Sequence, residues 1–172
     1  KGTQKDLDEL NELIEVVRNK LFQKICAKSS KHLALEAKPN SRILMPKDNY
    51  IVELLMEPYT RKYGVKLVYE GDYDLAVNPL ILDDQVNNIF EGIFKGEGLN
   101  FVKNENEIYP LANVSLDWIN SFLEMDGQEL IESENRDDLA ISFSAFLDDV
   151  APQYKDNVVS ASEFVSEKMK DK

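Results

Sequence analysis

Two adjacent acidic residues at a predicted strand-to-helix junction are the pair best placed to do chemistry. Asp83 and Asp84 follow a predicted strand, residues 74–77, and open a predicted helix, residues 83–94. Ligands of open α/β sheets gather at the carboxyl ends of the strands, so the acid pair stands where a nucleotide could bind. The alternative interpretation is that two acids in a first helical turn complement the helix dipole.

The turn that follows this helix joins one lysine to two glycines. Lys95, Gly96 and Gly98 have the spacing of a small anion-binding turn, although glycines also commonly end helices. We therefore predict that any nucleotide site would comprise these three residues together with Asp83 and Asp84.

Other reactive side chains are scarce. The chain has one cysteine, Cys26, and one histidine, His32, which excludes an internal disulfide and a zinc site built on paired cysteines. The turn 46–49 follows a predicted strand, where a phosphate would sit, but it has no glycine and Lys47 is its only cation. We therefore expect no cofactor and, for the isolated chain, no catalytic turnover.

The charge of the chain favours protein partners over polyanions. The 172 residues include 20 basic and 32 acidic ones, for a net charge of -12. The first hundred residues are nearly balanced, with 14 basic and 16 acidic, whereas the last 72 hold 6 and 16. Such a surface repels nucleic acid and anionic lipid, so we expect nucleic-acid contact only through a partner. With no run of about 18 apolar residues, we expect a cytoplasmic protein without membrane contact.

The N-terminal part is predicted to be an amphipathic helix over residues 6–28. Its apolar residues recur at alternating steps of three and four: Leu7, Leu10, Ile14, Val17, Leu21 and Ile25. The short apolar stretch 32–35 is then predicted to be a strand, and residues 38–41 a turn.

A β-α-β unit is predicted next, with strands at 42–45 and 65–69 and a helix over 50–63. Gly64 suits the left-handed position after that helix, and Pro58 is expected to kink or shorten it. With the strand at 74–77 and the helix at 83–94, the order predicts an α/β fold. We expect a mainly parallel sheet of four to five strands flanked by helices.

The remaining elements complete a single α/β domain over residues 1–172. It would consist of an N-terminal helix (1–30), a β-α-β core (38–112) and an acidic, helical C-terminal part (113–172). The predicted elements of the last two parts are strands at 99–103 and 107–109, a helix at 116–125 between Ser115 and Gly127, a helix at 137–150, and a helix at 160–169 opened by a capping box.

The C-terminal helices offer a candidate partner-binding surface. Phe143 and Phe146 alternate with acidic residues that include Asp148 and Asp149. If the aromatic side chains are exposed, they would anchor a partner whose basic surface the acids attract. The alternative is that the aromatic side chains lie in the core.

One stretch of the sequence resembles a known family. The strand, turn, double Asp and helix of residues 74–96 resemble the corresponding segment of PP-loop ATP pyrophosphatases. Residues 108–111, with the helix after Ser115, look like the Pro-Leu turn and following helix of the cytoplasmic tRNA 2-thiolation proteins, particularly their degenerate second subunit. Residues 143–168 are similar in spacing to that family's C-terminal helical pair.

Three departures from the family's motifs limit the function that the resemblance implies. The Ser-Gly-Gly-x-Asp-Ser phosphate loop is absent, Pro79 stands where the family has histidine, and no paired cysteines are present. The resemblance therefore implies a non-catalytic binding or scaffold subunit that supports a tRNA wobble-uridine thiolation enzyme.

A second resemblance gives a different function. The β-α-β unit 42–77 looks like the small phosphotransfer-type domains attached to bacterial transcription regulators, although the turn 46–49 has no Cys or His to accept phosphate. On this alternative the chain is a regulatory interaction domain. A binding or scaffold protein unrelated to either family is the third possibility.

Overall fold

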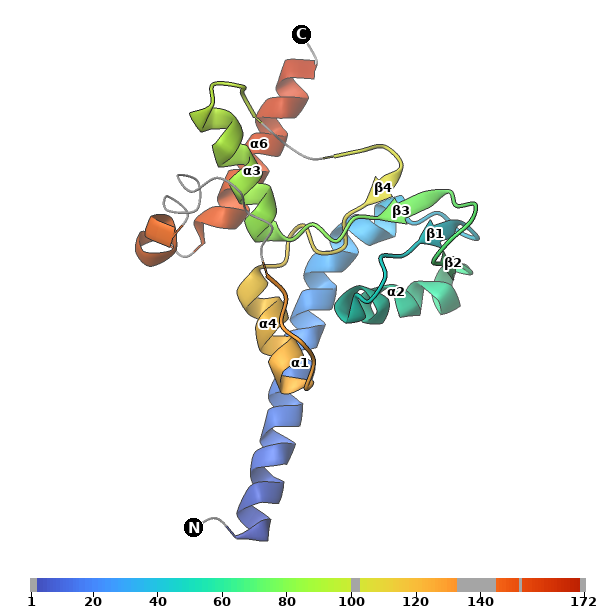
Figure 1. Cartoon of the computed structure of the whole chain (residues 1–172), viewed down its shortest axis with the longest axis vertical. Coiled ribbons are helices and arrows are strands. Elements are labelled where there is room, and N and C mark those ends of the chain that lie inside the picture. Colours follow the sequence, from blue (N-terminus) through green and yellow to red (C-terminus); the bar gives the residue numbers. More distant parts are fainter. Residues whose placement is uncertain (1–2, 100–102, 133–144, 152, 171–172) are drawn as a thin grey trace.

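A four-stranded parallel sheet organises the chain (Figure 1). The computed structural model describes residues 3–99, 103–132, 145–151 and 153–170. Within them the strand order is β2-β1-β3-β4, and every neighbouring pair is parallel. The strands are β1 (Arg42–Leu44), β2 (Lys66–Val68), β3 (Leu75–Val77) and β4 (Glu107–Ile108). The predicted α/β fold is therefore confirmed, and the strand order changes direction between β1 and β3.

Helix α2 (Tyr50–Tyr63) connects β1 to β2 and has the predicted bounds. The Asn49 side chain accepts a hydrogen bond of 3.2 Å from the backbone N–H of Val52, which caps the first turn. Gly64 ends the helix in the left-handed conformation, with φ of 65°. The helix continues through Pro58 for five more residues, so the proline does not shorten it.

Helix α1 (Gln4–Glu36) is longer than predicted, at 33 residues. A capping box between Thr3 and Asp6 begins it. The predicted strand at 32–35 is wrong because the helix continues through these residues. Leu33 is buried two turns beyond the buried Ile25, so it extends the inward face of the helix.

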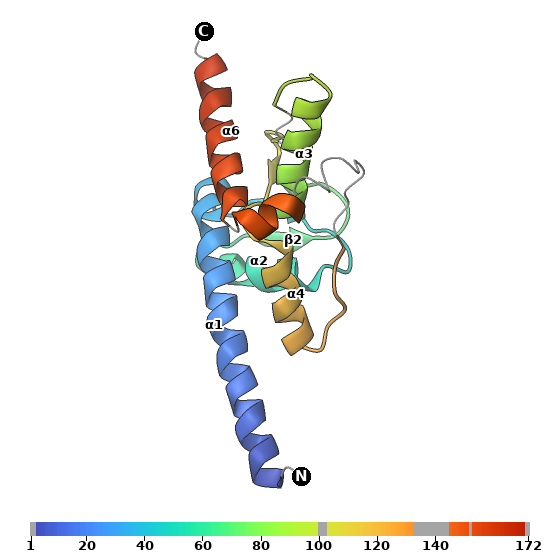
Figure 2. The ribbon, with the colours of Figure 1, turned by 90° about the vertical axis from the view of Figure 1, so that its left-hand side faces the viewer.

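Helices α3 (Leu82–Phe94) and α6 (Tyr154–Lys170) lie side by side, away from α2 (Figures 1 and 2). They share a second core cluster, in which the rings of Phe90 and Tyr154 stack with centroids 6.3 Å apart. Helix α6 begins six residues before the predicted start, so the predicted capping box at Ser160 is wrong. Burial of Tyr154 and Val159 against α3 keeps these residues helical.

The other C-terminal predictions meet the structure in part. Helix α4 (Leu116–Met125) has the predicted bounds, and the Ser115 side chain accepts a hydrogen bond from the N–H of Trp118. Residues 145–150 are helical, as predicted, while residues 137–144 lie outside the described part. Of the predicted strand at 99–103, residues 100–102 also lie outside it, and Leu99 and Lys103 are not in a strand.

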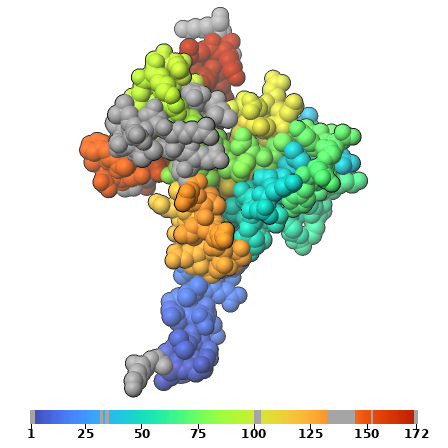
Figure 3. All heavy atoms as spheres, in the orientation of Figure 1, coloured from blue at the N-terminus to red at the C-terminus, as the bar shows by residue number. Residues whose placement is uncertain are grey.

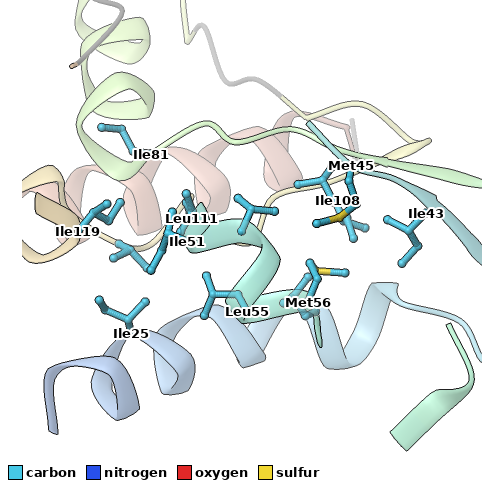
Figure 4. Packing of buried hydrophobic residues seen from close by; sticks show 14 of the residues in the cluster. Ile25, Ile43, Met45, Ile51, Leu55, Met56, Ile81, Ile108, Leu111 and Ile119 are labelled. Atoms are coloured by element: carbon cyan, nitrogen blue, oxygen red, sulfur yellow. The ribbon is translucent and has the colours of Figure 1, made fainter. Parts of the chain in front are cut away.

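The main core forms where α1, α2 and α4 meet the strands (Figure 4). Ile25 of α1, Ile51 of α2 and Ile119 of α4 are each at most 1% exposed. Met45 and Ile108, at the ends of β1 and β4, close the same cluster. The core therefore holds α1 through its C-terminal half.

Candidate protein-binding surface

Asp83 occupies a structural position in the first turn of α3. One carboxylate oxygen, Oδ2, accepts a hydrogen bond of 2.7 Å from the backbone N–H of Leu116, and the other forms an ion pair with Lys155. The Lys155 side chain is only 13% exposed and also contacts Asp148 at 3.2 Å. Burial by itself would lower the pKa of Lys155, but the two carboxylates outweigh it and raise the pKa. Asp83 therefore joins α3, α4 and α6.

The other predicted nucleotide-binding residues are divided between the two ends of α3. Asp84 is in the first turn with Asp83, whereas Lys95, Gly96 and Gly98 follow the last turn. The 12 residues from Asp83 to Lys95 correspond to about 18 Å at 1.5 Å per residue. Lys95 forms an ion pair with Glu91 one turn earlier. The structure does not bring the five residues into one site, and their nucleotide-binding role stays a prediction.

A hollow of about 980 Å³ opens at the other end of the strands. It is lined by residues that precede β1, β3 and β4, including Ser41 and Asp74, and by residues of α6. Glu107 lies on its wall and accepts a hydrogen bond of 2.6 Å from the Tyr109 hydroxyl. Burial and this hydrogen bond raise the pKa of Tyr109 to about 12. The hollow lies at the amino ends of the strands, opposite the edge where α/β sheets bind ligands.

The predicted partner-binding residues are at the surface where the structure describes them. Phe146 is 59% exposed, Asp149 is exposed, and Asp148 is partly engaged by Lys155. Leu147, beside them, packs against the cluster between α3 and α6. Phe143 lies outside the described residues. A partner site here stays a prediction.

A second apolar surface lies on the first half of α1. Residues 4–17, here called the α1 arm, project from the rest of the molecule in the ribbon and in the space-filling view (Figures 1 and 3). Six apolar side chains of the arm are between 38% and 59% exposed, and four of them form what we call the α1 stripe: Leu7, Leu10, Ile14 and Val17. Their spacing of three, four and three places them on one side of the helix.

The body of the protein contacts α1 from Arg18 onward. The Arg18 guanidinium forms an ion pair with Asp126, directly after α4, and lies 5.0 Å from the centre of the Phe122 ring. One turn later, Phe22 stacks on Phe122 with ring centroids 5.1 Å apart. Helix α4 therefore covers α1 where the arm ends.

An ion pair and a hydrogen bond at this junction hold the end of α4 against α1 and α2. Asp126 accepts hydrogen bonds from both Arg18 and the Tyr50 hydroxyl. Burial would raise the pKa of Asp126, but these two hydrogen bonds and the Arg18 charge lower it overall. The same contact with Asp126 raises the pKa of Tyr50. Sequence patterns contain no signal that brings residues 18, 50 and 126 together.

The charges of α1 are divided along its length. Five acidic residues lie between positions 6 and 15: Asp6, Asp8, Glu9, Glu12 and Glu15. Four basic residues and no acidic ones lie between positions 18 and 28: Arg18, Lys20, Lys24 and Lys28. Lys5 is the one cation of the arm, and it forms an i,i+4 pair with Glu9. The arm therefore carries the apolar stripe, and the rest of its surface holds the acidic residues together with the exposed Leu13 and Val16.

The apolar spacing of this surface was visible in the sequence, but its exposure was not. The pattern that predicts an amphipathic helix runs without a break from Leu7 to Ile25. Leu21 and Ile25 pack in the main core, whereas the earlier members of the pattern are exposed. Periodicity identifies an apolar face and does not say how far along the helix other elements cover it.

One result from the structure and two from the comparisons with known proteins concern the class of protein to which the chain could belong. Within the described residues, no helix is both long enough and apolar enough to cross a membrane. No protein-family model matches the chain. No curated protein matches it either.

Proposed function

We propose that the chain is a non-catalytic protein-binding or scaffold subunit that docks through the α1 stripe. The observation that supports this function is the exposure of four aligned apolar side chains, at 38% to 52%, on a helix that projects from the body. Contiguous apolar surface of this kind on a protein usually marks an interaction site.

Burial of the stripe would supply part of the free energy that specific binding requires. Complete burial of one Leu, Ile or Val side chain contributes about 1.5–3 kcal/mol. Four partly exposed side chains would contribute roughly 3–6 kcal/mol before the costs of association. Helix-in-groove and helix-to-helix recognition use anchors with this spacing.

The test compares two substitutions in the same helix. Ile14→Asp places a charge at the centre of the stripe, whereas Val16→Asp places it at a 49% exposed position on the opposite side. Tagged chains carrying each change would be used to capture partners from the source cells, and each captured protein would be purified and titrated against the chain. The proposal expects binding that Ile14→Asp weakens at least tenfold and Val16→Asp leaves unchanged. Equal binding by both variants would remove the stripe from the interface.

Support for a tRNA thiolation enzyme is the second candidate function. What favours it is the arrangement of β3, the turn 78–81 and α3 with Asp83 and Asp84 in its first turn, which has the order that the resemblance implies. Deletion of the gene, with mass spectrometry of thiolated wobble uridine in bulk tRNA, tests it. Unchanged thiolation would exclude this role and leave the regulatory-domain alternative, for which the captured partner would be a transcription regulator.

A further inference from the structure

We infer that the occupant of the α1 stripe is the α1 arm of a second copy of this chain, packed antiparallel. This inference rests on the proposed function and specifies its partner. Three features of α1 lead to it: the register of its apolar residues, the separation of its charges, and the point at which α4 begins to cover it.

The apolar register matches itself in the antiparallel direction. In heptad notation Leu7 and Ile14 occupy a positions, and Leu10 and Val17 occupy d positions. Antiparallel pairing about residue 12 places Leu7 of each copy against Val17 of the other, and Leu10 against Ile14. Every residue of the stripe then faces one apolar residue, in four consecutive layers.

The flanking charges select this direction over the parallel one. In the same register Asp6 of each copy lies beside Lys20 of the other, and both residues are exposed. The acidic stretch 6–15 then lies opposite residues 9–18 of the other copy, and its Asp6 end reaches the start of the basic stretch 18–28. A parallel pair in register would set both Asp6 residues at one end and both Lys20 residues at the other, so it would gain no such opposite-charge pair.

The length of the arm fits a single antiparallel overlap. Residues 4–17 span about 21 Å at 1.5 Å per residue. The N-terminal end of the partner's helix would lie near residue 20 of the first copy. This is next to the point where Asp126 and Phe122 hold α1 against α4. The paired stripe would then continue directly into the core formed by Leu21 and Ile25. No exposed member of the stripe would be left uncovered.

Sedimentation equilibrium over a concentration series tests whether the pair forms. Wild type and Val16→Asp are expected to dimerise with the same dissociation constant. Ile14→Asp is expected to raise that constant roughly a hundredfold, since each dimer loses two buried isoleucines. Circular dichroism would check that all three proteins fold. A wild type that stays monomeric at every concentration, or dimerisation that Ile14→Asp leaves intact, would overturn the inference.

Site-directed disulfides test the direction of pairing. In a Cys26→Ala background, Leu13→Cys would place each new thiol beside its own symmetry mate in the antiparallel pair. Ile14→Cys would do so only in a parallel pair, because in the antiparallel register Ile14 faces Leu10. Mild oxidation is expected to cross-link Leu13→Cys faster than Ile14→Cys. The reverse order of rates would refute the antiparallel arrangement.

The outcomes separate this inference from the function on which it rests. A monomeric chain that captures a different protein, with capture lost in Ile14→Asp and kept in Val16→Asp, would refute the second-copy occupant and support the proposed function. A chain that neither dimerises nor binds through the stripe would refute both.

Discussion

The Asp83 carboxylate accepts a hydrogen bond of 2.7 Å from the backbone amide of Leu116, the first residue of α4. The first four N–H groups of a helix have no partner within it, so the carboxylate satisfies one of these donors and complements the helix dipole. Its second oxygen pairs with Lys155 of α6. A residue predicted as a ligand-binding acid is thus the point where three helices are joined.

Replacement of Asp83 by alanine should destabilise the fold. The change leaves the N–H of Leu116 without its acceptor and removes the closest countercharge from a lysine that is 13% exposed. We expect a loss of about 2–4 kcal/mol in the free energy of unfolding, measured by urea denaturation.

Two further variants separate the parts of this loss. Asp83→Asn keeps an acceptor for the Leu116 amide and removes only the charge, so it should cost less than Asp83→Ala. Asp117→Ala changes an exposed acid in the same turn of α4 and should stay within about 0.5 kcal/mol of wild type. Equal stability of all the variants would show that Asp83 does not join the helices.

Asp126 should make the stability of the protein depend on pH in the acid range. Its pKa in the folded chain is lowered from 3.8, so the folded state binds fewer protons than the unfolded state near that pH. The stabilisation is therefore complete above pH 3.8 and is lost as the pH falls through the lower, folded pKa. Asp126→Asn should cost about 1–2 kcal/mol at neutral pH, and the difference from wild type should narrow in acid.

Urea denaturation at a series of pH values measures this effect. Glu124→Gln, at an exposed position of α4, serves as the control and should differ little from wild type at any pH. A difference between wild type and Asp126→Asn that stays constant into acid would contradict the link between Asp126 ionisation and stability.

Gly64 and Gly127 allow a comparison of backbone strain with and without a steric clash. Both have positive φ, at 65° and 67°. A Cβ at Gly64 would lie 2.6 Å from Oδ1 of Asn40, whereas one at Gly127 would meet nothing within 4 Å. We expect Gly127→Ala to cost about 1 kcal/mol and Gly64→Ala about 2 kcal/mol. In an Asn40→Gly background the cost of Gly64→Ala should fall toward that of Gly127→Ala, and an unchanged cost would rule out the clash.

Capping residues, glycines and apolar periodicity predicted most of the helices and strands, because these signals act over a few neighbouring residues. Helices α2 and α4 have the predicted bounds because a capping side chain and a terminal glycine mark the ends of each. The predictions were wrong where packing between residues distant in the sequence determines the secondary structure. The apolar run 32–35 has the composition of a strand, but burial of Leu33 beside the core makes it helical.

The candidate site was less predictable than the fold, for the same reason. Asp83 was identified by its place after a strand, but its partner Lys155 is 72 positions away in the sequence. The stripe on α1 was identified as apolar, but its exposure depends on where α4 ends, at a contact between Arg18 and Asp126 that spans 108 positions. A pattern within a few neighbouring residues cannot predict contacts between residues so far apart in the sequence.

The two halves of α1 should respond differently to the same kind of truncation. Leu10 is 52% exposed on the arm, whereas Ile25 is fully buried among residues of α4 and α2. Leu10→Ala should change the free energy of unfolding of the monomer by less than about 0.5 kcal/mol. Alanine has a high helix propensity, and the side chain that is removed makes few contacts with the rest of the monomer. Ile25→Ala should cost about 2–5 kcal/mol, because it leaves a cavity in the core. Denaturation of both variants at concentrations too low for self-association measures the difference, and amide exchange should be faster in residues 4–17 than in residues 18–36. A Leu10→Ala loss comparable to that of Ile25→Ala would mean that the arm is packed within the monomer, and the α1 stripe would then not be available to a partner.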